Sequence, residues 1–541
     1  MEANYATVWE AIADTIGDED AVIQGPRRVS WRDLDARASR LAGAFAEAGV
    51  VRDGKVALYL YNAPEYIEAW FAAMKLRAVP VNVNYRYLDE ELHYLLDNSD
   101  SEVVVFHSSL GDRVARVRDR LPLVTRWIEV ADDEAHVDGT DRYEDVVSRS
   151  APAPRIERSP DDIGITYTGG TTGMPKGVMS HVGGGVMTGL VTLPPLLGLP
   201  PQQPDDVPAT ARRLTEEGRR ALSLVACPLM HGTGMGIGTT PAMTMGGAVV
   251  LLEGRRFDPR EVWDAAERDA VTAITVVGDS FARPMVRALE DEESQGRSRD
   301  LSSVRLIASA GTMFSREVKE ALVARMPQVL ILDLMASTEG GMAQSVFTKD
   351  HTAETARFQL NPSAKVFTED DREVAPGSGE VGMLAVAGAT PLGYYKDPEK
   401  SARTFREIAG VRYSFPGDFA TVESDGTITL LGRGSQVINT GGEKVFAEEV
   451  EEVVKRHPAV DDCLVVGVPD ERFGQRVVAI AAPADGDAGA IDPTEVIAHT
   501  KAHLAAYKVP KQVIVVASVP RAPNGKADYA TARDLASAPP A

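Results

Sequence analysis

Apolar runs alternate with amphipathic stretches over the first 330 residues, and this alternation predicts a parallel α/β fold. Stretches such as 64–76 carry apolar residues at helical spacing and separate the runs. Strands that alternate with helices form parallel sheets with helices on both faces, and ligands bind at the carboxyl ends of their strands. The segments after residues 167 and 333 are therefore candidate ligand sites. The predicted strands are 55–61, 79–84, 102–106, 247–252, 272–278, 304–310 and 328–333.

The pattern changes from about residue 360. Residues 379–386 and 419–433 predict antiparallel strands, the second stretch forming a hairpin that turns at 424–426, so a small β-barrel or sheet is expected. A polar stretch follows, and 448–456 then predicts a helix with Glu-to-Lys/Arg pairs four residues apart. The sequence thus predicts a large N-terminal α/β domain over 1–433 and a small α+β domain over 434–541.

Residues 199–220 interrupt the pattern with a proline-rich start and a charged end that predicts a helix. A solvated excursion is the favoured interpretation of this insertion. A lid over a substrate pocket is the alternative.

Composition narrows the classes of partner. The chain has 541 residues, which exceeds one hydrophobic core, and 57 basic against 79 acidic residues give a net charge of −22. This charge opposes non-specific binding to nucleic acid or anionic membranes. The two cysteines stand far apart, which fits a reducing cytoplasm, and no signal peptide or apolar run long enough to span a membrane is predicted. Whether the chain forms a homodimer is left open.

Glycines, threonines and a lysine are concentrated at 167–177, where the sequence reads YTGGTTGMPKG. Glycines let backbone N–H groups approach phosphate oxygens, threonine hydroxyls add donors, and Lys176 adds a positive charge. It is not a Walker loop, because Pro175 precedes the lysine and Gly177 follows it. The stretch predicts a phosphate-binding loop made by Thr168, Gly169, Gly170, Thr171, Thr172, Gly173 and Lys176.

This stretch resembles the phosphate loop of the adenylate-forming superfamily, which includes acyl-CoA synthetases, luciferases and peptide-synthetase adenylation domains. Further segments match that superfamily in order: SAGT at 309–312, DLMASTEGG at 333–341, SFPGDFA at 414–420, LLGRGSQ at 430–436, GGEKVFAEEVE at 441–451 and PRAPNGKADY at 520–529. The ordered set covers nearly the whole chain and is more specific than any single motif.

The resemblance implies a nucleotide and metal site. Thr338 would bind phosphate oxygens and Glu339 would help to hold Mg²⁺, which prefers oxygen ligands. Asp418 would bind the ribose hydroxyls, with Arg433 nearby. Met335 and the residue after it stand where an aromatic residue and a glycine are commoner in the family. The remaining residues implied near the nucleotide are Ser309, Ala310, Gly311, Asp333 and Ser337.

The resemblance also implies a moving C-terminal domain. Lys526 would reach the substrate carboxylate and the α-phosphate during adenylation, where its charge offsets that of the transition state. Gly441 and Gly442 would line the CoA tunnel in a second orientation. Ser435 stands at the family's hinge, where Asp or Lys is more usual.

The acyl pocket is expected beside the segment CPLMHGTGM at 227–235 and the segment VVGDSFARP at 276–284. The candidate pocket residues are His231, Val277, Gly278, Asp279 and Phe281. A structural role for His231 is as well supported as a catalytic one. The glycines of 231–238 leave room for a bulky acid or simply permit close packing.

The whole pattern looks most like actinobacterial acyl-CoA synthetases that act on fatty acids or steroid side chains. The implied reaction uses ATP, Mg²⁺ and CoA to convert a bulky hydrophobic acid into its thioester through an acyl-adenylate. Two rivals share the adenylate: an amide-bond synthetase and an enzyme that loads a carrier protein. A catalytically dead binding protein would be expected to lack Lys526, Glu339 or the phosphate loop, all of which this chain has.

Overall fold

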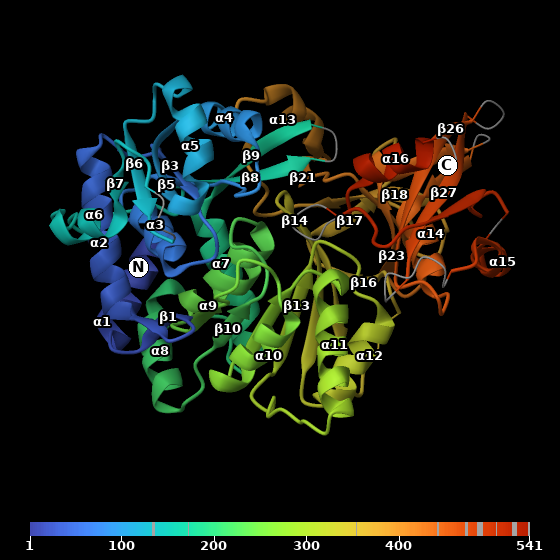
Figure 1. The fold of residues 1–541 in the computed structure, drawn as a ribbon, viewed down its shortest axis with the longest axis horizontal. Helices are drawn as coiled ribbons and strands as arrows, with labels where there is room; N and C mark the ends of the chain where they lie inside the picture. The colour runs from blue at the N-terminus through green and yellow to red at the C-terminus, as the bar shows by residue number, and fades with distance from the viewer. Residues whose placement is uncertain are drawn as a thin grey trace.

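The computed structural model describes residues 1–132, 136–170, 173–352, 354–440, 443–470, 474–483, 491–504, 506–521 and 527–538. The N-terminal helices lie at one end of the longest axis and the elements after residue 437 at the other (Figure 1). This is a mixed α/β protein with a large N-terminal part and a small C-terminal part, and the predicted fold class is confirmed.

A parallel five-stranded sheet forms the first layer, in the order β4-β3-β5-β6-β7. Its strands are β3 (Lys55–Tyr59), β4 (Val79–Asn82), β5 (Ser101–His107), β6 (Arg126–Val130) and β7 (Asp141–Arg142). The predicted helix at 64–76 is α3, which begins at Pro64 because a proline lacks only an N–H that the first turn would leave unpaired. The helices here are α1 (Tyr5–Ile16), α2 (Trp31–Glu47), α3 (Pro64–Lys75), α4 (Asp89–Asn98), α5 (Gly111–Val117) and α6 (Tyr143–Arg149).

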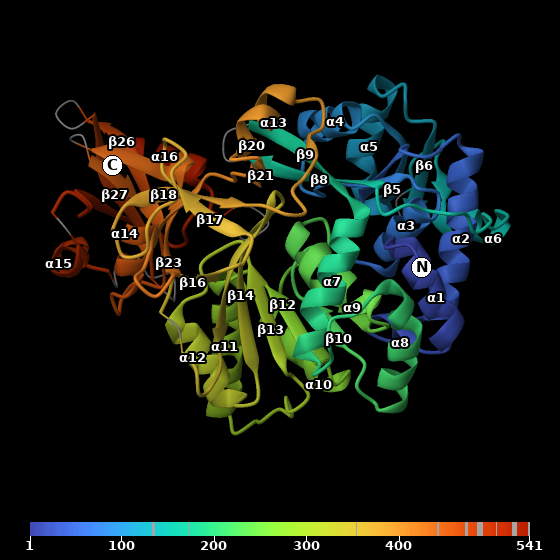
Figure 2. The ribbon, with the colours of Figure 1, turned by 180° about the vertical axis from the view of Figure 1, so that it is seen from behind.

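A second, larger sheet starts parallel and ends antiparallel. Its parallel part runs β1-β11-β10-β12-β13-β14, and α10, α11 and α12 cover the face turned to the viewer in Figure 1, whereas Figure 2 shows the strands in front. The strands are β1 (Asp20–Gln24), β2 (Arg27–Ser30), β10 (Leu222–Val225), β11 (Ala248–Leu251), β12 (Ala273–Val276), β13 (Leu306–Ala310) and β14 (Leu330–Ser337), and the helices are α9 (Thr240–Thr244), α10 (Pro259–Arg268), α11 (Asp279–Ser294) and α12 (Arg316–Arg325).

The strands predicted as a small barrel continue this sheet rather than standing apart from it. Strand β14 runs four residues beyond the predicted end at Asp333 because it pairs as a hairpin with β15. The predicted hairpin over 419–433 is confirmed as β22 and β23. The antiparallel strands are β15 (Gly340–Phe347), β16 (Arg357–Leu360), β17 (Ala364–Phe367), β18 (Val381–Val386), β20 (Phe405–Ile408), β21 (Val411–Ser414), β22 (Asp418–Val422) and β23 (Thr427–Arg433).

The glycine-rich motif lies in a small separate sheet, β19-β9-β8, made of β8 (Ile163–Gly170), β9 (Gly173–His181) and β19 (Gly393–Tyr394). We expected the motif to follow a parallel strand, and this was wrong. Strands β8 and β9 pair antiparallel, so the motif is the tip of a hairpin, and β19 returns from more than 200 residues later to pair with β9.

The C-terminal elements have a sheet of their own, in the order β25-β24-β27-β26 with β28 beside β27. Successive residues of β26 and β27 enter two different hydrophobic clusters, one that includes α14 and one that includes α16, so both faces of the sheet are covered. The predicted helix at 448–456 is α14. The elements are β24 (Val437–Thr440), β25 (Glu443–Phe446), α14 (Ala447–Lys455), β26 (Asp462–Asp470), β27 (Gly474–Ala482), α15 (Pro493–His503), β28 (Gln512–Val515) and α16 (Tyr529–Ser537).

The insertion at 199–220 follows α7 (Val182–Leu196) and forms α8 (Val207–Glu216) after a single 3₁₀ turn. Helix α8 buries Val207, Thr210, Ala211 and Leu214, which lie on one face, and this face packs against α1. The insertion is therefore a packed helix rather than a fully solvated excursion. Among the described residues, no helix is long and apolar enough to cross a membrane.

Candidate functional site

The hairpin formed by β8 and β9 is called the phosphate hairpin here, after the role predicted for its tip. It places Thr168 directly opposite Lys176 and Gly170 opposite Gly173. Thr171 and Thr172 at its tip lie outside the described residues. The Lys176 ammonium forms an ion pair with Asp397, which also caps α13 (Pro398–Thr404) by accepting from the Lys400 N–H at 3.0 Å. The hydrogen bond from Lys176 holds the pKa of the Asp397 carboxyl below its usual value. The hairpin lysine is thus already positioned by a carboxylate.

Asn82, at the end of β4, ties this hairpin to the segment that precedes His231. Its amide N–H group donates to the Tyr167 carbonyl at 2.8 Å and to the Met230 carbonyl at 2.7 Å, and its oxygen accepts from the Tyr167 N–H at 2.8 Å. Asn62 similarly accepts from the Leu229 N–H and donates to the carbonyl oxygen two residues earlier. Sequence reasoning missed both asparagines, although Asn62 follows β3 and Asn82 ends β4, where a parallel sheet presents ligands.

Thr338 and Glu339 form the turn between β14 and β15. The Glu339 N–H donates to the Ser337 hydroxyl at 3.2 Å, and one Glu339 carboxylate oxygen accepts from the Tyr394 hydroxyl at 2.6 Å. Tyr394 belongs to β19, beside the phosphate hairpin. The predicted metal carboxylate and the predicted phosphate loop are therefore linked through one strand, which the sequence did not indicate.

Two predicted segments meet at the end of β13. The Ser309 hydroxyl accepts from the Gly278 N–H at 2.9 Å, and the Thr312 hydroxyl donates to the Val277 carbonyl at 3.2 Å. Gly278 has a φ of +51°, and a Cβ there would collide with the Met313 carbonyl. Glycine is required at this close approach. The strand end at 309–311 and the wall at 277–281 accordingly form one surface, with Ala310 buried and Gly311 at a φ of +98°.

Asp333 and Met335 point into the interior. The buried Asp333 carboxylate accepts from the Lys319 ammonium of α12 at 2.7 Å, and burial raises its pKa despite that partner. Met335 packs in the hydrophobic cluster of the antiparallel strands and is 7% exposed. Asp333 thus has an ion-pair partner within the protein, and the adenine contact expected of Met335 stays a prediction.

Asp418 and Arg433 are direct cross-strand partners at the ends of β22 and β23. Asp418 is buried, whereas the Arg433 and Ser435 side chains lie outside the described part of the chain. The joint contact of Asp418 and Arg433 with the ribose stays a prediction. Ser435 lies in the short 3₁₀ turn that leads into β24.

His231 precedes a π-helical segment over Thr233–Thr239. Such segments are rare and are frequent at functional sites. Its glycines divide into two kinds: a Cβ at Gly234 would collide with the Pro228 carbonyl, whereas nothing lies within 4 Å of a Cβ at Gly232 or Gly236. The segment is therefore closely packed at Gly234 and open at Gly232 and Gly236, both of which are exposed, and room for a bulky acid stays a prediction.

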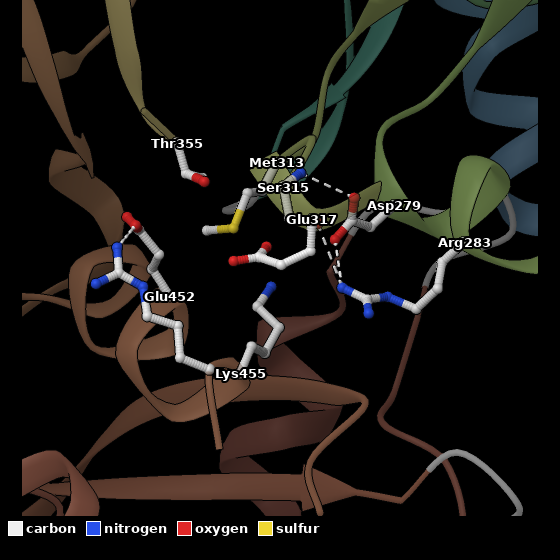
Figure 3. A pocket seen from close by; sticks show the side chains of 9 residues that line it. Asp279, Arg283, Met313, Ser315, Glu317, Thr355, Glu452 and Lys455 are labelled. Carbon is white, nitrogen blue, oxygen red and sulfur yellow. Dashed lines mark hydrogen bonds and ion pairs between the residues drawn. The ribbon is translucent and has the colours of Figure 1, made fainter. Parts of the chain in front are cut away.

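Asp279 faces a pocket between the two parts of the chain (Figure 3). Its carboxylate accepts from the Ser315 N–H at 2.9 Å and pairs with Arg283, and the α14 residue Lys455 points toward Glu317 across the gap. Asp461, just before β26, pairs with both Arg283 and Arg287 of α11. Asp279 thus organises the junction with the C-terminal elements, while Phe281 is buried against Phe257 at 4.5 Å between ring centroids.

Comparison with known proteins decides the family. Residues 9–395 match AMP-binding enzymes and residues 449–526 match the C-terminal domain of AMP-binding enzymes. The chain belongs to the AMP-binding enzyme family. The predicted membership of the adenylate-forming superfamily and the predicted enzyme class, an AMP-forming acyl-CoA synthetase, are confirmed.

Relatives that match over nearly their whole length narrow the assignment within this family. The chain is 40% identical over 561 residues to the 3-oxocholest-4-en-26-oate–CoA ligase of Rhodococcus rhodochrous, covering 100% of this chain and 97% of that one. It is 38% identical to the medium-chain acyl-CoA ligase Mig of Mycobacterium avium, over 98% of this chain and 97% of Mig. These relatives support the acyl-CoA ligase assignment over the amide and carrier-loading alternatives.

Solved structures share the fold at lower identity. The anthranilate CoA ligase AuaEII in complex with anthranoyl-AMP superposes with a TM-score of 0.84 at 22% identity, covering 99% of both chains. The amide bond synthetase McbA from Marinactinospora thermotolerans superposes with a TM-score of 0.77 at 24% identity, covering 99% of this chain and 100% of McbA. The fold is thus common to ligases with different acceptors. Lys526, Gly441 and Gly442 lie outside the described residues.

Proposed function

We propose that the chain joins a bulky hydrophobic carboxylic acid to CoA, using ATP and an acyl-adenylate intermediate. The observation that carries this proposal is the meeting of Lys176 and Glu339 at one short segment. Residues 394–397 contact both of them, through Tyr394 and Asp397. Lys176 as the phosphate-binding cation and Glu339 as the metal-binding carboxylate would together bind the phosphates and the metal ion of a nucleoside triphosphate.

In the first half-reaction, an oxygen of the substrate carboxylate attacks Pα of ATP and the bond to pyrophosphate breaks. Lys176 would neutralise phosphate charge, and Lys526 would offset the charge brought together by the two anions. Thr338 would donate to a phosphate oxygen, and the paired positions Asp418 and Arg433 would hold the ribose.

Mg²⁺ fits the donor set at Glu339. Among the described residues, no three His, Cys, Asp or Glu side chains are grouped as a metal cage. Mg²⁺ does not need one, because it usually binds one or two protein carboxylates together with phosphates and water. Glu339 would hold the ion, which would supply charge neutralisation for the phosphates.

In the second half-reaction, residues 434–541 would act as a mobile domain that turns about Ser435. The turn would withdraw Lys526 and bring Gly441 and Gly442 to the adenylate, where glycines leave room for the pantetheine arm. The CoA sulfur would then attack the acyl carbon and AMP would leave. One moving domain serves both steps, as in other enzymes whose closure completes a site.

A fatty acid or a steroid side chain is the substrate class we propose. The relatives named for such acids support it, and so does the open space beside Gly232 and Gly236, next to His231. His231 would flank the acyl group, with Val277 and Phe281 in the opposite wall. A cytoplasmic location is part of the proposal, and a homodimer stays a prediction.

The fold does not identify the group that accepts the acyl chain, because the amide bond synthetase McbA has the same fold. The deciding experiment measures acid-dependent AMP release over fatty, aromatic and steroid-side-chain acids, with and without CoA, and identifies the products by mass spectrometry. Lys526→Ala serves as the control that should release no AMP above background. A CoA thioester from one acid class supports the proposal, whereas an adenylate that accumulates in the presence of CoA would favour the amide or carrier-loading alternative.

A further inference from the structure

Residues 392–397 cross the phosphate hairpin and bind it through the backbone. The Leu392 N–H donates to the Met179 carbonyl and the Tyr395 N–H donates to the Gly177 carbonyl, each at 2.7 Å. At the end of the segment, Asp397 pairs with Lys176 of the hairpin. The segment is therefore attached to β9 at three points and cannot shift independently of the phosphate hairpin.

The two tyrosines of this segment point in different directions. The Tyr394 hydroxyl donates to Glu339 at 2.6 Å, and the Tyr395 hydroxyl donates to Asp100 at 2.7 Å. Asp100 lies between α4 and β5, and it also accepts from the Lys396 ammonium at 2.8 Å. Tyr394 is the last residue of β19 and Tyr395 follows it. Neighbouring side chains along an extended segment face opposite sides, so one phenol points to the turn at Glu339 and the next points away from it.

The ring and the backbone of Tyr394 are both fixed by their neighbours. The residue is 4% exposed, its ring lies 5.6 Å from that of Phe405, and its N–H donates to the Ser401 hydroxyl at 2.8 Å. Its ring also packs in a small cluster with Val178 of β9. A buried ring with a fixed backbone presents its hydroxyl in one place, so Tyr394 fixes one oxygen of Glu339.

We propose that Tyr394 is a positioning residue, which orients the Glu339 carboxylate so that its other oxygen faces the metal and the phosphates of ATP. This rests on the proposed role of Glu339. Hydrogen bonds behind a metal ligand fix its orientation, and their loss typically lowers metal affinity 10- to 100-fold. Because β19 is bound to the hairpin, the same contact keeps Glu339 in register with Lys176.

The test compares Tyr394→Phe with the matched control Tyr395→Phe. Each change removes one hydroxyl and one hydrogen bond to a carboxylate, but only the first touches Glu339. Equilibrium binding of ATP is measured by titration calorimetry with and without Mg²⁺, together with the Mg²⁺ dependence of ATP–pyrophosphate exchange. Thermal melting without ligand confirms that both variants fold.

Tyr394→Phe should weaken binding of Mg·ATP about 10-fold and raise the half-saturating Mg²⁺ concentration by a similar factor, while Mg²⁺-free ATP binds as in the wild type. Tyr395→Phe should leave all three quantities within about 2-fold. In a Glu339→Gln background, Tyr394→Phe should add little, because the two residues act as a unit.

Equal effects of the two tyrosine changes, or wild-type Mg²⁺ dependence in Tyr394→Phe, would overturn the positioning role. Glu339→Gln separates this failure from that of the proposed function. If Glu339→Gln itself binds Mg·ATP as the wild type does, Glu339 is not the metal carboxylate and the proposed nucleotide site is wrong. If it weakens binding and Tyr394→Phe does not, only the inference on Tyr394 fails.

Discussion

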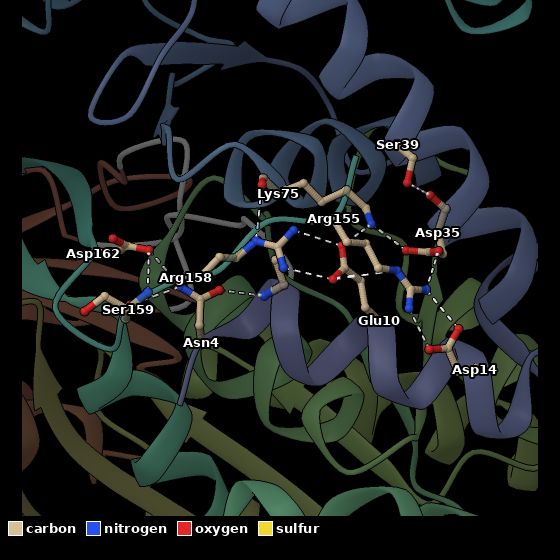
Figure 4. A network of polar contacts seen from close by, with 11 residues as sticks. Asn4, Glu10, Asp14, Asp35, Ser39, Lys75, Arg155, Arg158, Ser159 and Asp162 are labelled. Atoms are coloured by element: carbon tan, nitrogen blue, oxygen red, sulfur yellow. Dashed lines mark hydrogen bonds and ion pairs between the residues drawn. The ribbon is translucent and has the colours of Figure 1, made fainter. Parts of the chain in front are cut away.

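Replacing Glu10 by Gln should destabilise the N-terminal part of the protein without changing its shape. Glu10 of α1 is 5% exposed and accepts two hydrogen bonds from Arg158, at 2.8 and 2.9 Å, and one from Lys75 at 2.8 Å (Figure 4). Lys75 also donates to Asp35 at 2.5 Å. The substitution keeps the volume and removes the one carboxylate that pairs with Arg158 among the residues that the structure describes.

The expected loss of unfolding free energy depends on the contacts that Arg158 and Lys75 keep after the substitution. Removing one partner of a buried ion pair costs about 3–5 kcal/mol, because it leaves an uncompensated charge. Lys75 keeps Asp35, and the glutamine oxygen can still accept a hydrogen bond, so we expect the low end, about 3 kcal/mol. The matched control is Asp18→Asn, whose pair with Arg32 is exposed, at 91% and 65%, so its loss should change the stability far less than Glu10→Gln does.

Urea unfolding followed by tryptophan fluorescence measures this loss locally. Trp9 precedes Glu10 and lies 5.9 Å from Trp31 and 5.3 Å from Trp70 between ring centroids, so three of the five tryptophans report on the network. A loss no larger than that of Asp18→Asn at neutral pH would refute the reasoning.

The pH dependence gives an independent check. Burial alone would raise the pKa of Glu10, but Arg158 and Lys75 outweigh it and the pKa is lowered. A carboxyl with a lowered pKa contributes stability that is present above its unfolded pKa, about 4.3, and is lost as the pH falls through the folded value. The gap between wild type and Glu10→Gln should therefore shrink below about pH 4. A gap that stays constant in acid would contradict the assignment.

Three further predictions concern the site. Lys526→Ala should nearly abolish adenylate formation and spare CoA attack on a supplied acyl-adenylate, and Gly442→Trp should do the reverse; equal loss of both half-reactions would remove these roles. Asp461→Ala should change the ratio of the two half-reaction rates a few-fold, because the partly exposed ion pairs that it removes contribute at most about 1 kcal/mol. Single-turnover assays of each half-reaction would measure that ratio. Gly236→Val should fold normally but disfavour long acids in the AMP-release assay, whereas Gly234→Val should fail to fold stably in thermal melting.

The sequence predicted the parallel strands, the hairpin at 419–433 and the family, because apolar periodicity and motif order are local signals. It placed the glycine-rich motif wrongly, since ITY reads like any apolar strand and nothing local distinguishes a parallel strand from one arm of a hairpin. The β9–β19 pairing joins residues more than 200 positions apart. No periodicity encodes such a contact, and Tyr394 and Asp397 were missed for this reason.

Asn62 and Asn82 were missed for a different reason. A single asparagine is a common residue at strand ends and turns. These two are distinguished only by side-chain hydrogen bonds to distant backbone groups, two from Asn62 and three from Asn82. Lys319 was missed in the same way: it pairs with Asp333 from α12 and belongs to no motif, while the ligand contact expected of Asp333 stays a prediction. Side chains that act by holding the site leave little trace in local sequence patterns.

The distribution of ion pairs fits a protein in which one part must stay rigid while another turns. The network at Glu10 joins α1, α3 and the segment just before the phosphate hairpin, and it is almost fully buried, so breaking it is costly. Asp461 meets Arg283 and Arg287 at 25% and 39% exposure, where ion pairs contribute at most about 1 kcal/mol. The C-terminal sheet has its own hydrophobic clusters, which contain none of these three residues. The proposed rotation would therefore break the weak pairs and leave the strong network, and with it the phosphate hairpin, in place.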